Sequence, residues 1–313
     1  PGDISGETVV GEGGRLSGGV SVETIGADKF VVTWSEDPNN NASDFDEIVN
    51  AQIFDNTGSA VGAVVEVNAG LSQKSVQNAQ AVDLPNGEFA IAWNGTDQNS
   101  SAGSFKIFNA DGVPQSEAIA VQNIGEFHAF SDGNMLFVSD NIAKVIAPDG
   151  SQVGDTIILT PQSWGRVAIL PNNDFMVSFN ESENTFNNDE NTFIKLFGSD
   201  GHAKSGKIQL NIPEGSVTAT YDTVSLERAE IAVSEDGTVV VTWMELDKHF
   251  IVGGMAIWAT PKQVTKTFDS AALQALDGAP DFIYIPAADD HDVSTPTDAN
   301  ADGNSISESA SDG

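Results

Sequence analysis

The stretch FVVTWSE occupies residues 30–36, and a near copy, VVVTWME, occupies residues 239–245. Two further versions lie between them, FAIAWNG at residues 89–95 and FMVSFNE at residues 175–181. In each version both faces of the extended chain carry apolar or small side chains, which is typical of a strand packed on both sides. The chain therefore repeats one strand-forming phrase, and a repeat architecture is expected.

The repeat extends beyond this phrase. We take the aromatic slot as its anchor, and the third copy is degenerate because a serine fills the slot; the anchors are Trp34, Trp93, Ser139, Phe179 and Trp243. A turn signal and an apolar run precede each anchor, and a second phrase with a glycine turn follows it. These glycines are Gly58, Gly112, Gly150 and Gly201, and the fifth second phrase is IWATPKQVTK, from Ile257. Glycine readily supplies the positive φ that such turns need.

Each unit thus reads as four short strands in roughly 40 to 60 residues, a pattern typical of propeller blades. Five units span residues 16–268. We therefore predict an all-β fold, a five-bladed β-propeller of four-stranded blades, in which residues 7–10 pair with the last blade to close the ring. A β-sandwich array or a β-solenoid is the alternative. The repeated aromatic is expected to be interior packing between blades rather than a platform for a ligand.

Composition limits the function. The chain has 46 Asp and Glu against 13 Lys and Arg, a formal net charge of −33, so nucleic-acid binding is excluded. It has no cysteine, which rules out disulfides and thiolate metal sites. No apolar run approaches the roughly 18 residues of a membrane span. Self-repulsion among so many carboxylates suits a salt-rich or calcium-rich setting, and we expect an extracellular or cell-surface bacterial protein.

The first unit, FVVTWSE…IVNAQIFDNTGSAVG…VEVN (residues 30–68), resembles repeats of large secreted bacterial proteins of the RTX type, which include adhesins and hemolysin-type calcium-binding proteins. The resemblance covers the five units and is specific in the first two. It implies a secreted or surface-attached protein that carries other modules, is exported by a type I system and uses the propeller for adhesion or as a scaffold. The glycine- and aspartate-rich calcium-binding nonapeptides of that family are absent, so calcium does not follow from the resemblance.

The pattern changes after residue 268, which we take as the end of the propeller, residues 1–268. Residues 269–286 predict a short helix, capped by Asp269 and ended by Gly278, and then a strand, DFIYIP, that docks on the propeller. Residues 287–313 are almost free of apolar side chains and rich in Asp, Ser, Asn and Thr. They predict an acidic linker or tail.

The tail holds one candidate metal site. In DANADGNSISES, the residues Asp298, Asn300 and Asp302 match the first ligands of a calcium loop, followed by the turn residue Gly303. The twelfth position should be a bidentate Glu, but Glu308 stands one residue early. Calcium is thus the one cofactor that the sequence suggests, and a chance match in an acidic linker is the alternative.

Glu36, Glu181 and Glu245 share one repeat position, two residues after their anchors. Paired carboxylates are the catalytic groups of glycosidases, so these three are the candidate catalytic residues if the chain is an enzyme. Charged residues also flank most strands of an acidic protein, and that interpretation is favoured. The acidic stretches 35–47 and 180–191 are expected to be loops, where binding residues often lie.

Three functions remain open. The absence of a nucleophile elbow, phosphate loop or histidine metal motif favours a non-catalytic module that binds a glycan or a protein, or that spaces other modules. The first alternative is a glycoside-active enzyme that uses Glu36, Glu181 and Glu245. The second alternative is a structural subunit of a surface layer or filament, with the tail as a calcium-dependent joint.

Overall fold

The computed structural model describes residues 15–40, 46–71, 74–96, 101–159, 165–184, 189–210, 221–225, 229–234, 236–251, 255–258 and 262–283. The chain forms two compact units. The first unit comprises Pro1–Trp164, Pro171–Asp174 and Gly198–His202, and the second comprises Gly165–Leu170, Phe175–Phe197 and Ala203–Gly313.

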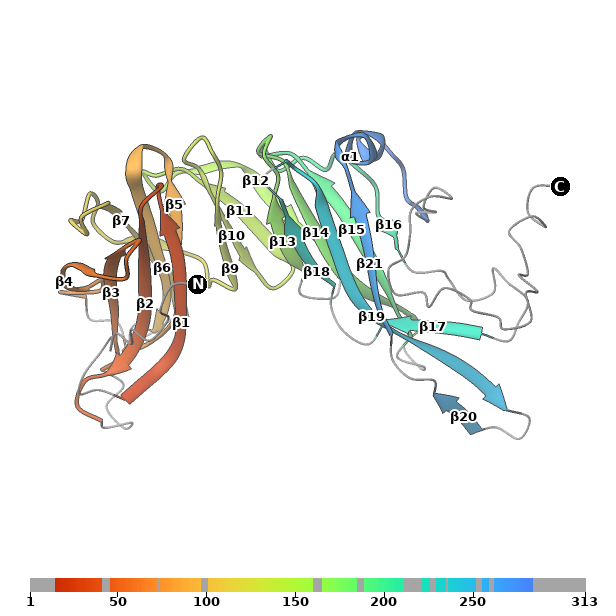
Figure 1. The fold of residues 1–313 in the computed structure, drawn as a ribbon, viewed down its shortest axis with the longest axis horizontal. Coiled ribbons are helices and arrows are strands. Elements are labelled where there is room, and N and C mark those ends of the chain that lie inside the picture. Colours follow the sequence, from red (N-terminus) through yellow and green to blue (C-terminus); the bar gives the residue numbers. More distant parts are fainter. Residues whose placement is uncertain are drawn as a thin grey trace. The chain divides into compact units, whose positions relative to one another are not determined.

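The first unit contains three antiparallel four-stranded sheets, each with its strands in chain order (Figure 1). The first sheet consists of β1 (Arg15–Ile25), β2 (Lys29–Asp37), β3 (Ile48–Asp55) and β4 (Ala60–Glu66). The second sheet consists of β5 (Lys74–Leu84), β6 (Glu88–Thr96), β7 (Ser101–Asn109) and β8 (Ile119–Val121), and the short 3-10 helix Pro85–Gly87 joins β5 to β6. The third sheet consists of β9 (Glu126–Ala129), β10 (Met135–Ser139), β11 (Ile142–Ile146) and β12 (Gln152–Ile158).

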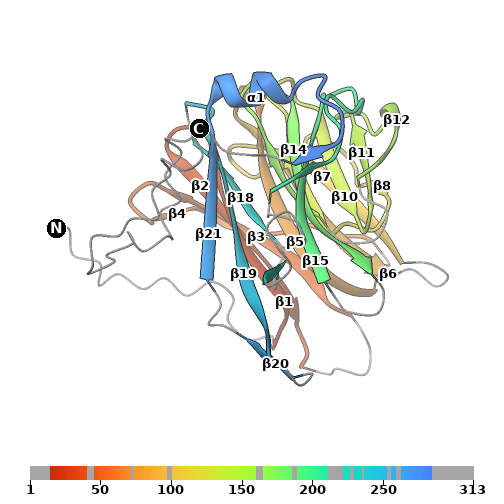
Figure 2. The same cartoon turned by 90° about the vertical axis from the view of Figure 1, so that its right-hand side faces the viewer.

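The described residues of the second unit form two sheets and one helix. The fourth sheet consists of β13 (Arg166–Ile169), β14 (Phe175–Asn184), β15 (Asp189–Phe197) and β16 (Ile208–Gln209), to which β22 (Phe282–Ile283) adds in parallel. The fifth sheet is built around β19 (Val239–Ile251), which pairs with β17 (Tyr221–Ser225), β18 (Glu230–Val233), β20 (Met255–Trp258) and β21 (Lys262–Phe268). The helix is α1 (Ser270–Leu276), and Figure 2 shows β21 leading into it.

The described residues therefore form five small sheets of mostly antiparallel strands, one for each predicted repeat, and the all-β prediction is confirmed. The anchor lies on the second strand of each of the first four sheets (β2, β6, β10 and β14) and on the central strand β19 of the fifth. All anchors are interior, and their exposed fractions are Trp34 1%, Trp93 0%, Ser139 8%, Phe179 2% and Trp243 1%. The aromatic repeat is thus part of the core.

A cross-strand ring pair recurs where the second and third strands meet. Phe30 lies opposite Phe54 with the ring centroids 5.2 Å apart, and the equivalent pairs Phe89–Phe108 and Phe175–Phe197 are at 5.4 and 5.1 Å. In the third sheet the pair is Met135 with Ile146. Such pairs stabilise antiparallel strands and fix their register.

The predicted glycine turns follow these pairs. The four glycines all have positive φ, which is 81° at Gly58, 80° at Gly112, 88° at Gly150 and 83° at Gly201. An acidic or amide side chain closes each of these turns by accepting backbone N–H bonds. Asp55 Oδ1 accepts from Thr57 and Ser59, both at 2.9 Å, and Asn109, Asp149 and Asp200 also accept backbone N–H bonds in their turns.

Neighbouring sheets pack face to face within each unit. In the first unit, apolar side chains of the first sheet, including Val31 and Ile53, form one cluster with Ala79, Ala81 and Trp93 of the second. The opposite face of the second sheet packs on the third through a cluster that includes Phe105, Phe127 and Phe137. In the second unit, a third cluster joins the fourth sheet, the fifth sheet and Leu276 of α1.

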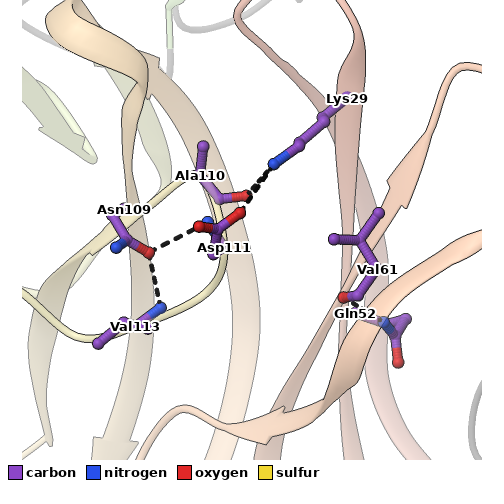
Figure 3. Close-up of polar contacts among 7 residues, drawn as sticks. All are labelled: Lys29, Gln52, Val61, Asn109, Ala110, Asp111 and Val113. Carbon is purple, nitrogen blue, oxygen red and sulfur yellow. Dashed lines mark hydrogen bonds and ion pairs between the residues drawn. The ribbon is translucent and has the colours of Figure 1, made fainter.

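Polar contacts reinforce this packing. Thr33 Oγ1, just before the anchor Trp34, donates to Ala79 O at 3.3 Å, and Ser178 Oγ, just before the anchor Phe179, donates to Ala229 O at 2.7 Å. The same repeat position therefore links the first sheet to the second and the fourth sheet to the fifth. Figure 3 shows another link, in which Lys29 Nζ of β2 donates to Ala110 O and Asp111 Oδ1 at 3.0 and 2.9 Å.

The fifth sheet departs from the predicted repeat. The third strand opposite its anchor is β21, because Phe268 pairs with Val239 as Phe54 pairs with Phe30. The phrase beginning at Ile257 instead lies in β20, in a hairpin extension where Ile257 pairs with His249. The prediction that the second phrase of the fifth unit begins at Ile257 is wrong. It rested on the local likeness between the residues that start at Ile257 and those that start at Ile53, whereas pairing with β19 decides which strand is the third of the sheet.

The chain then returns to the fourth sheet. Asp269 caps α1, since its side chain accepts from Ala272 N at 2.8 Å, and Gly278 follows the helix with φ of 75°. Next, β22 pairs with β16, so that Phe282 lies beside Ile208. The helix and the docking strand both lie where the sequence predicts them. The predicted pairing of residues 7–10 and the acidic tail, residues 287–313, fall outside the described residues.

The expected loop at residues 180–191 is largely strand, because β14 and β15 continue into it and Glu181 pairs with Asn191. Residues 38–47 do connect two strands, β2 and β3. The two acidic stretches are therefore not equivalent in structure, although both follow an anchor strand.

Candidate functional site

The three glutamates predicted as candidate catalytic residues lie on anchor strands. Glu36 is on β2 in the first unit, whereas Glu181 on β14 and Glu245 on β19 belong to the second. The backbone of Glu245 is paired with Ser225 and Lys262, and its side chain lies outside the described part of the chain. The chemistry of the position is therefore read from Glu36 and Glu181.

Glu36 is bound within its own sheet. Its Oε2 accepts from Trp34 Nε1 at 3.2 Å, and its Oε1 accepts from Asn50 Nδ2 at 2.8 Å. Asn50 lies opposite Trp34 on β3, so one carboxylate bridges the second and third strands. Both oxygens thus satisfy polar groups beside the buried anchor, where an unpaired indole N–H would be costly.

Glu181 is engaged by a cation. It forms an ion pair with Lys207, and the two side chains are 16% and 36% exposed. Lys207 Nζ also lies 4.4 Å from the centroid of the Phe193 ring, a cation–π contact. The backbone N of Lys207 donates to Asp281 Oδ1 at 2.6 Å, which ties the segment before β22 to the same place. This cluster fastens the C-terminal segment to the fourth sheet.

These contacts bear on the glycosidase alternative. Retaining glycosidases hold two carboxyl groups roughly 5 Å apart, and inverting enzymes hold them somewhat further apart. Glu36 instead bonds an indole and an amide, and Glu181 pairs with a lysine. Each carboxylate therefore acts as a structural acceptor in its own sheet.

A different group of titratable side chains lies on the first strands of the three sheets of the first unit. Glu23 is on β1, Asp83 on β5, and Glu126 and His128 on β9, the first strands of three successive sheets. His128 Nε2 and Glu126 Oε2 are 3.2 Å apart, and their side chains are 27% and 21% exposed. Asp83 Oδ1 accepts from Gly26 N at 3.1 Å, which joins the β1–β2 turn to β5.

Electrostatics links these residues. Burial, and then the negative charge of Asp83, raise the pKa of Glu23 above its ordinary value of 4.5; a hydrogen bond from Thr24 and the charge of His128 oppose this rise. We name Glu23, Asp83, Glu126 and His128 the inner-strand cluster. The sequence analysis did not predict this cluster. One signal was available, because Glu23 and His128 occupy the same repeat position, seven residues before Phe30 and Met135 respectively.

The connection between β2 and β3, residues 38–47, is held together at its two ends. Asn39 Nδ2 donates to Asp46 Oδ2 at 2.9 Å, and Asn39 N donates to Asp37 Oδ1 at 3.2 Å. Asp37 itself is 2% exposed. The hydrogen bond between Asn39 and Asp46 thus holds the two ends of this connection together, and connections between strands are where binding residues often lie.

The predicted calcium ligands Asp298, Asn300, Asp302 and Glu308 lie outside the described residues. Among the residues that the structure does describe, no group of three or more His, Asp or Glu side chains is arranged to hold a metal ion. In that same part of the chain, no helix has the length and apolar character needed to cross a membrane.

Comparison with known proteins identifies no family. No family model matches the chain, and no curated protein matches it. Among solved structures, it is similar to a protein of unknown function from Bacteroides caccae, with 14% identity, a TM-score of 0.44, and 76% of this chain and 73% of that chain covered.

Two further structures show a comparable likeness. Kuenenia stuttgartiensis hydrazine synthase matches with 13% identity, a TM-score of 0.48, and 86% of this chain and 67% of that chain covered. A xylan β-1,4-xylosidase from Bacillus halodurans C-125 matches with 10% identity, a TM-score of 0.37, and 90% and 60% covered. Similarity at this level carries no argument about function.

Proposed function

We propose that this protein is a non-catalytic binding or scaffold module of a secreted or cell-surface bacterial protein, and that it binds a glycan or a protein. One observation carries the proposal: the residues repeated in every unit serve the interior. The anchors are buried, and the carboxylates of Glu36 and Glu181 bond groups of their own sheets. Variation is left to the connections between strands, where binding usually lies on a rigid scaffold.

For the architecture, we propose that the five sheets form a five-bladed propeller in which the fifth blade is followed by the first. Support comes from β1. Val20 and Val22 are 56% and 61% exposed, whereas Ala79 and Ala81, at the same repeat positions in the second sheet, are 3% and 5% exposed because the first sheet covers them. An apolar row that is buried in one repeat and exposed in another suits a surface that closes a ring.

The hydroxyl links give this proposal a test. Thr33 bonds Ala79 O and Ser178 bonds Ala229 O, and the corresponding pair for ring closure is Thr242 with Val20. The chain has no cysteine, so a Thr242→Cys and Val20→Cys pair can be joined selectively by a short bis-maleimide. We expect intramolecular cross-linking as efficient as for the control pair Thr33→Cys and Ala79→Cys. Cross-linking of the control pair alone would refute the closed ring.

The ligand is proposed to bind at the connections that follow the anchor strands, of which residues 38–47 form the longest example. The test uses the 313-residue chain on glycan arrays and on immobilised host surface proteins, with calcium or with a chelator. In the key variant, residues 38–47 are replaced by the two-residue turn Asp-Asn that joins β10 to β11 in the third sheet at residues 140–141. We expect binding to be lost in this variant while its circular dichroism is unchanged.

The same preparations separate binding from catalysis. Glu36→Gln, Glu181→Gln and Glu245→Gln are expected to keep ligand binding, and polysaccharide hydrolysis by the parent chain should not exceed the buffer control. Hydrolysis that disappears in any of the three variants would replace the binding proposal with the glycosidase. If all variants bind the ligand equally well, including the one in which residues 38–47 are replaced, the ligand site lies elsewhere.

The extracellular setting is proposed from the net charge of −33. Cations should stabilise such a chain by screening, and calcium bound at specific sites should do so at far lower concentration. Thermal unfolding in millimolar CaCl2 is therefore compared with NaCl of matched ionic strength. A larger rise in the unfolding temperature with calcium than with NaCl supports calcium as a cofactor. Equal rises in the unfolding temperature indicate screening alone.

A further inference from the structure

The inner-strand cluster joins three sheets at their edges. β1 packs along β5, and β5 packs along β9, so Glu23, Asp83 and the Glu126–His128 pair lie on three neighbouring strands of one compact unit. All four residues are partly buried. The hydrogen bond from Gly26 N to Asp83 Oδ1, at 3.1 Å, shows how closely the first two of these strands approach.

The cluster contains three carboxyl groups and one imidazole, so its charge depends on pH. Lys29, the lysine of the neighbouring strand β2, is engaged with Asp111 and Ala110 O, on the third-to-fourth strand turn of the second sheet. The charged groups that act on Glu23 are Asp83, which repels its carboxylate, and His128, which attracts it in its protonated form. Glu126 Oε2 lies 3.2 Å from His128 Nε2, so these two side chains contact one another.

We propose that the inner-strand cluster is a pH-responsive junction that tightens the packing of the first three sheets as the pH falls and the carboxyl group of Glu23 is protonated. Protonation of Glu23 removes its repulsion from Asp83 and reduces the cost of burying a charge between the strands. This inference stands on the first unit alone and does not depend on the identity of the ligand.

The direction of the pH effect follows from linkage. A carboxyl group whose pKa is raised on folding binds its proton more tightly in the folded state, so its contribution favours folding at low pH. The pKa of Glu23 is raised from 4.5. Its contribution to stability is therefore complete below pH 4.5 and is lost as the pH rises through the folded value.

The decisive variant is Glu23→Gln, which keeps the shape of the side chain and is neutral at every pH. Glu66→Gln is the matched control, because Glu66 is an exposed glutamate on β4 of the same sheet. The free energy of unfolding of the complete chain and amide hydrogen exchange in β1 and β5 are measured from pH 4.5 to 7.5, with exchange corrected for its intrinsic rate.

We expect the parent chain and Glu66→Gln to become more stable, and to exchange more slowly in β1 and β5, as the pH falls through this range. Glu23→Gln should be more stable than the parent at pH 7.5 and should gain less stability than the parent as the pH falls. Asp83→Asn, which keeps an acceptor for Gly26 N, should also reduce the pH dependence of the free energy of unfolding. Direct titration of the Glu23 carboxyl by NMR gives an independent answer: a pKa at or below 4.5, or parallel stability curves for the parent and Glu23→Gln, would overturn the proposal.

Discussion

Four glycines at one repeat position allow backbone strain to be separated from packing between sheets. Gly58, Gly112, Gly150 and Gly201 have φ between 80° and 88°, so alanine at any of them meets the same conformational cost, about 1–2 kcal/mol. Their surroundings differ. A Cβ at Gly58 meets nothing within 4 Å, whereas a Cβ at Gly150 would lie 2.6 Å from Ile119 Cγ2, on β8 of the preceding sheet.

Overpacking of this kind adds about 1–3 kcal/mol, since Ile119 is β-branched and its Cγ2 cannot swing away easily. We therefore expect Gly58→Ala to cost about 1–2 kcal/mol and Gly150→Ala about 2–5 kcal/mol. Gly112→Ala should fall between them, because its Cβ would lie 3.1 Å from the flexible end of Ile53, the Cδ1 atom.

The assay is equilibrium urea unfolding followed by tryptophan fluorescence, with the variants compared at constant slope. Adding Ile119→Ala to Gly150→Ala removes the clash, so a double-mutant cycle should show a coupling of about 1 kcal/mol or more. Adding it to Gly58→Ala should show none. Equal losses for Gly58→Ala and Gly150→Ala, within about 0.5 kcal/mol, would refute the view that the turn of one sheet is fitted against the sheet before it.

Three other predictions test local features. Asp269→Ala removes the acceptor for Ala272 N and should lower the free energy of unfolding by about 1 kcal/mol in urea, whereas Asp269→Ser should restore most of it. Ser178→Ala leaves Ala229 O without its 2.7 Å hydroxyl donor between two packed sheets and should cost about 1–3 kcal/mol, whereas Thr, which keeps the hydroxyl, should cost less. The Ser234 hydroxyl and the Thr238 amide lower the pKa of Asp236 from 3.8 to about 2, so its contribution to stability is present above pH 3.8 and disappears as the pH falls toward 2. Acid unfolding of Asp236→Asn should lack this part of the pH dependence, and an unchanged acid limb would contradict the assignment.

The features that depend on nearby residues could be predicted from the sequence. Short runs with apolar or small side chains on both faces predicted the anchor strands and the burial of Trp34, Trp93 and Trp243. A glycine is needed wherever the chain takes positive φ, so the turn at Gly150 and its equivalents could be located without a structure. The helix cap at Asp269 could also be predicted, because its side chain accepts a hydrogen bond from the backbone N–H of Ala272, only three residues later.

The tertiary structure alone decided which distant groups meet. Glu36 and Glu181 share a repeat position, yet one bonds Trp34 and Asn50 and the other pairs with Lys207. The same holds for Phe268, whose place opposite Val239 is set by cross-strand register.

Glu23 and Asp83 are far apart in the chain and influence one another only because two sheets bring their first strands together. Backbone conformation is governed by sterics within a few residues, and a single sequence displays it. Charge interactions depend on distance in space and on burial, and both quantities arise only when the sheets pack.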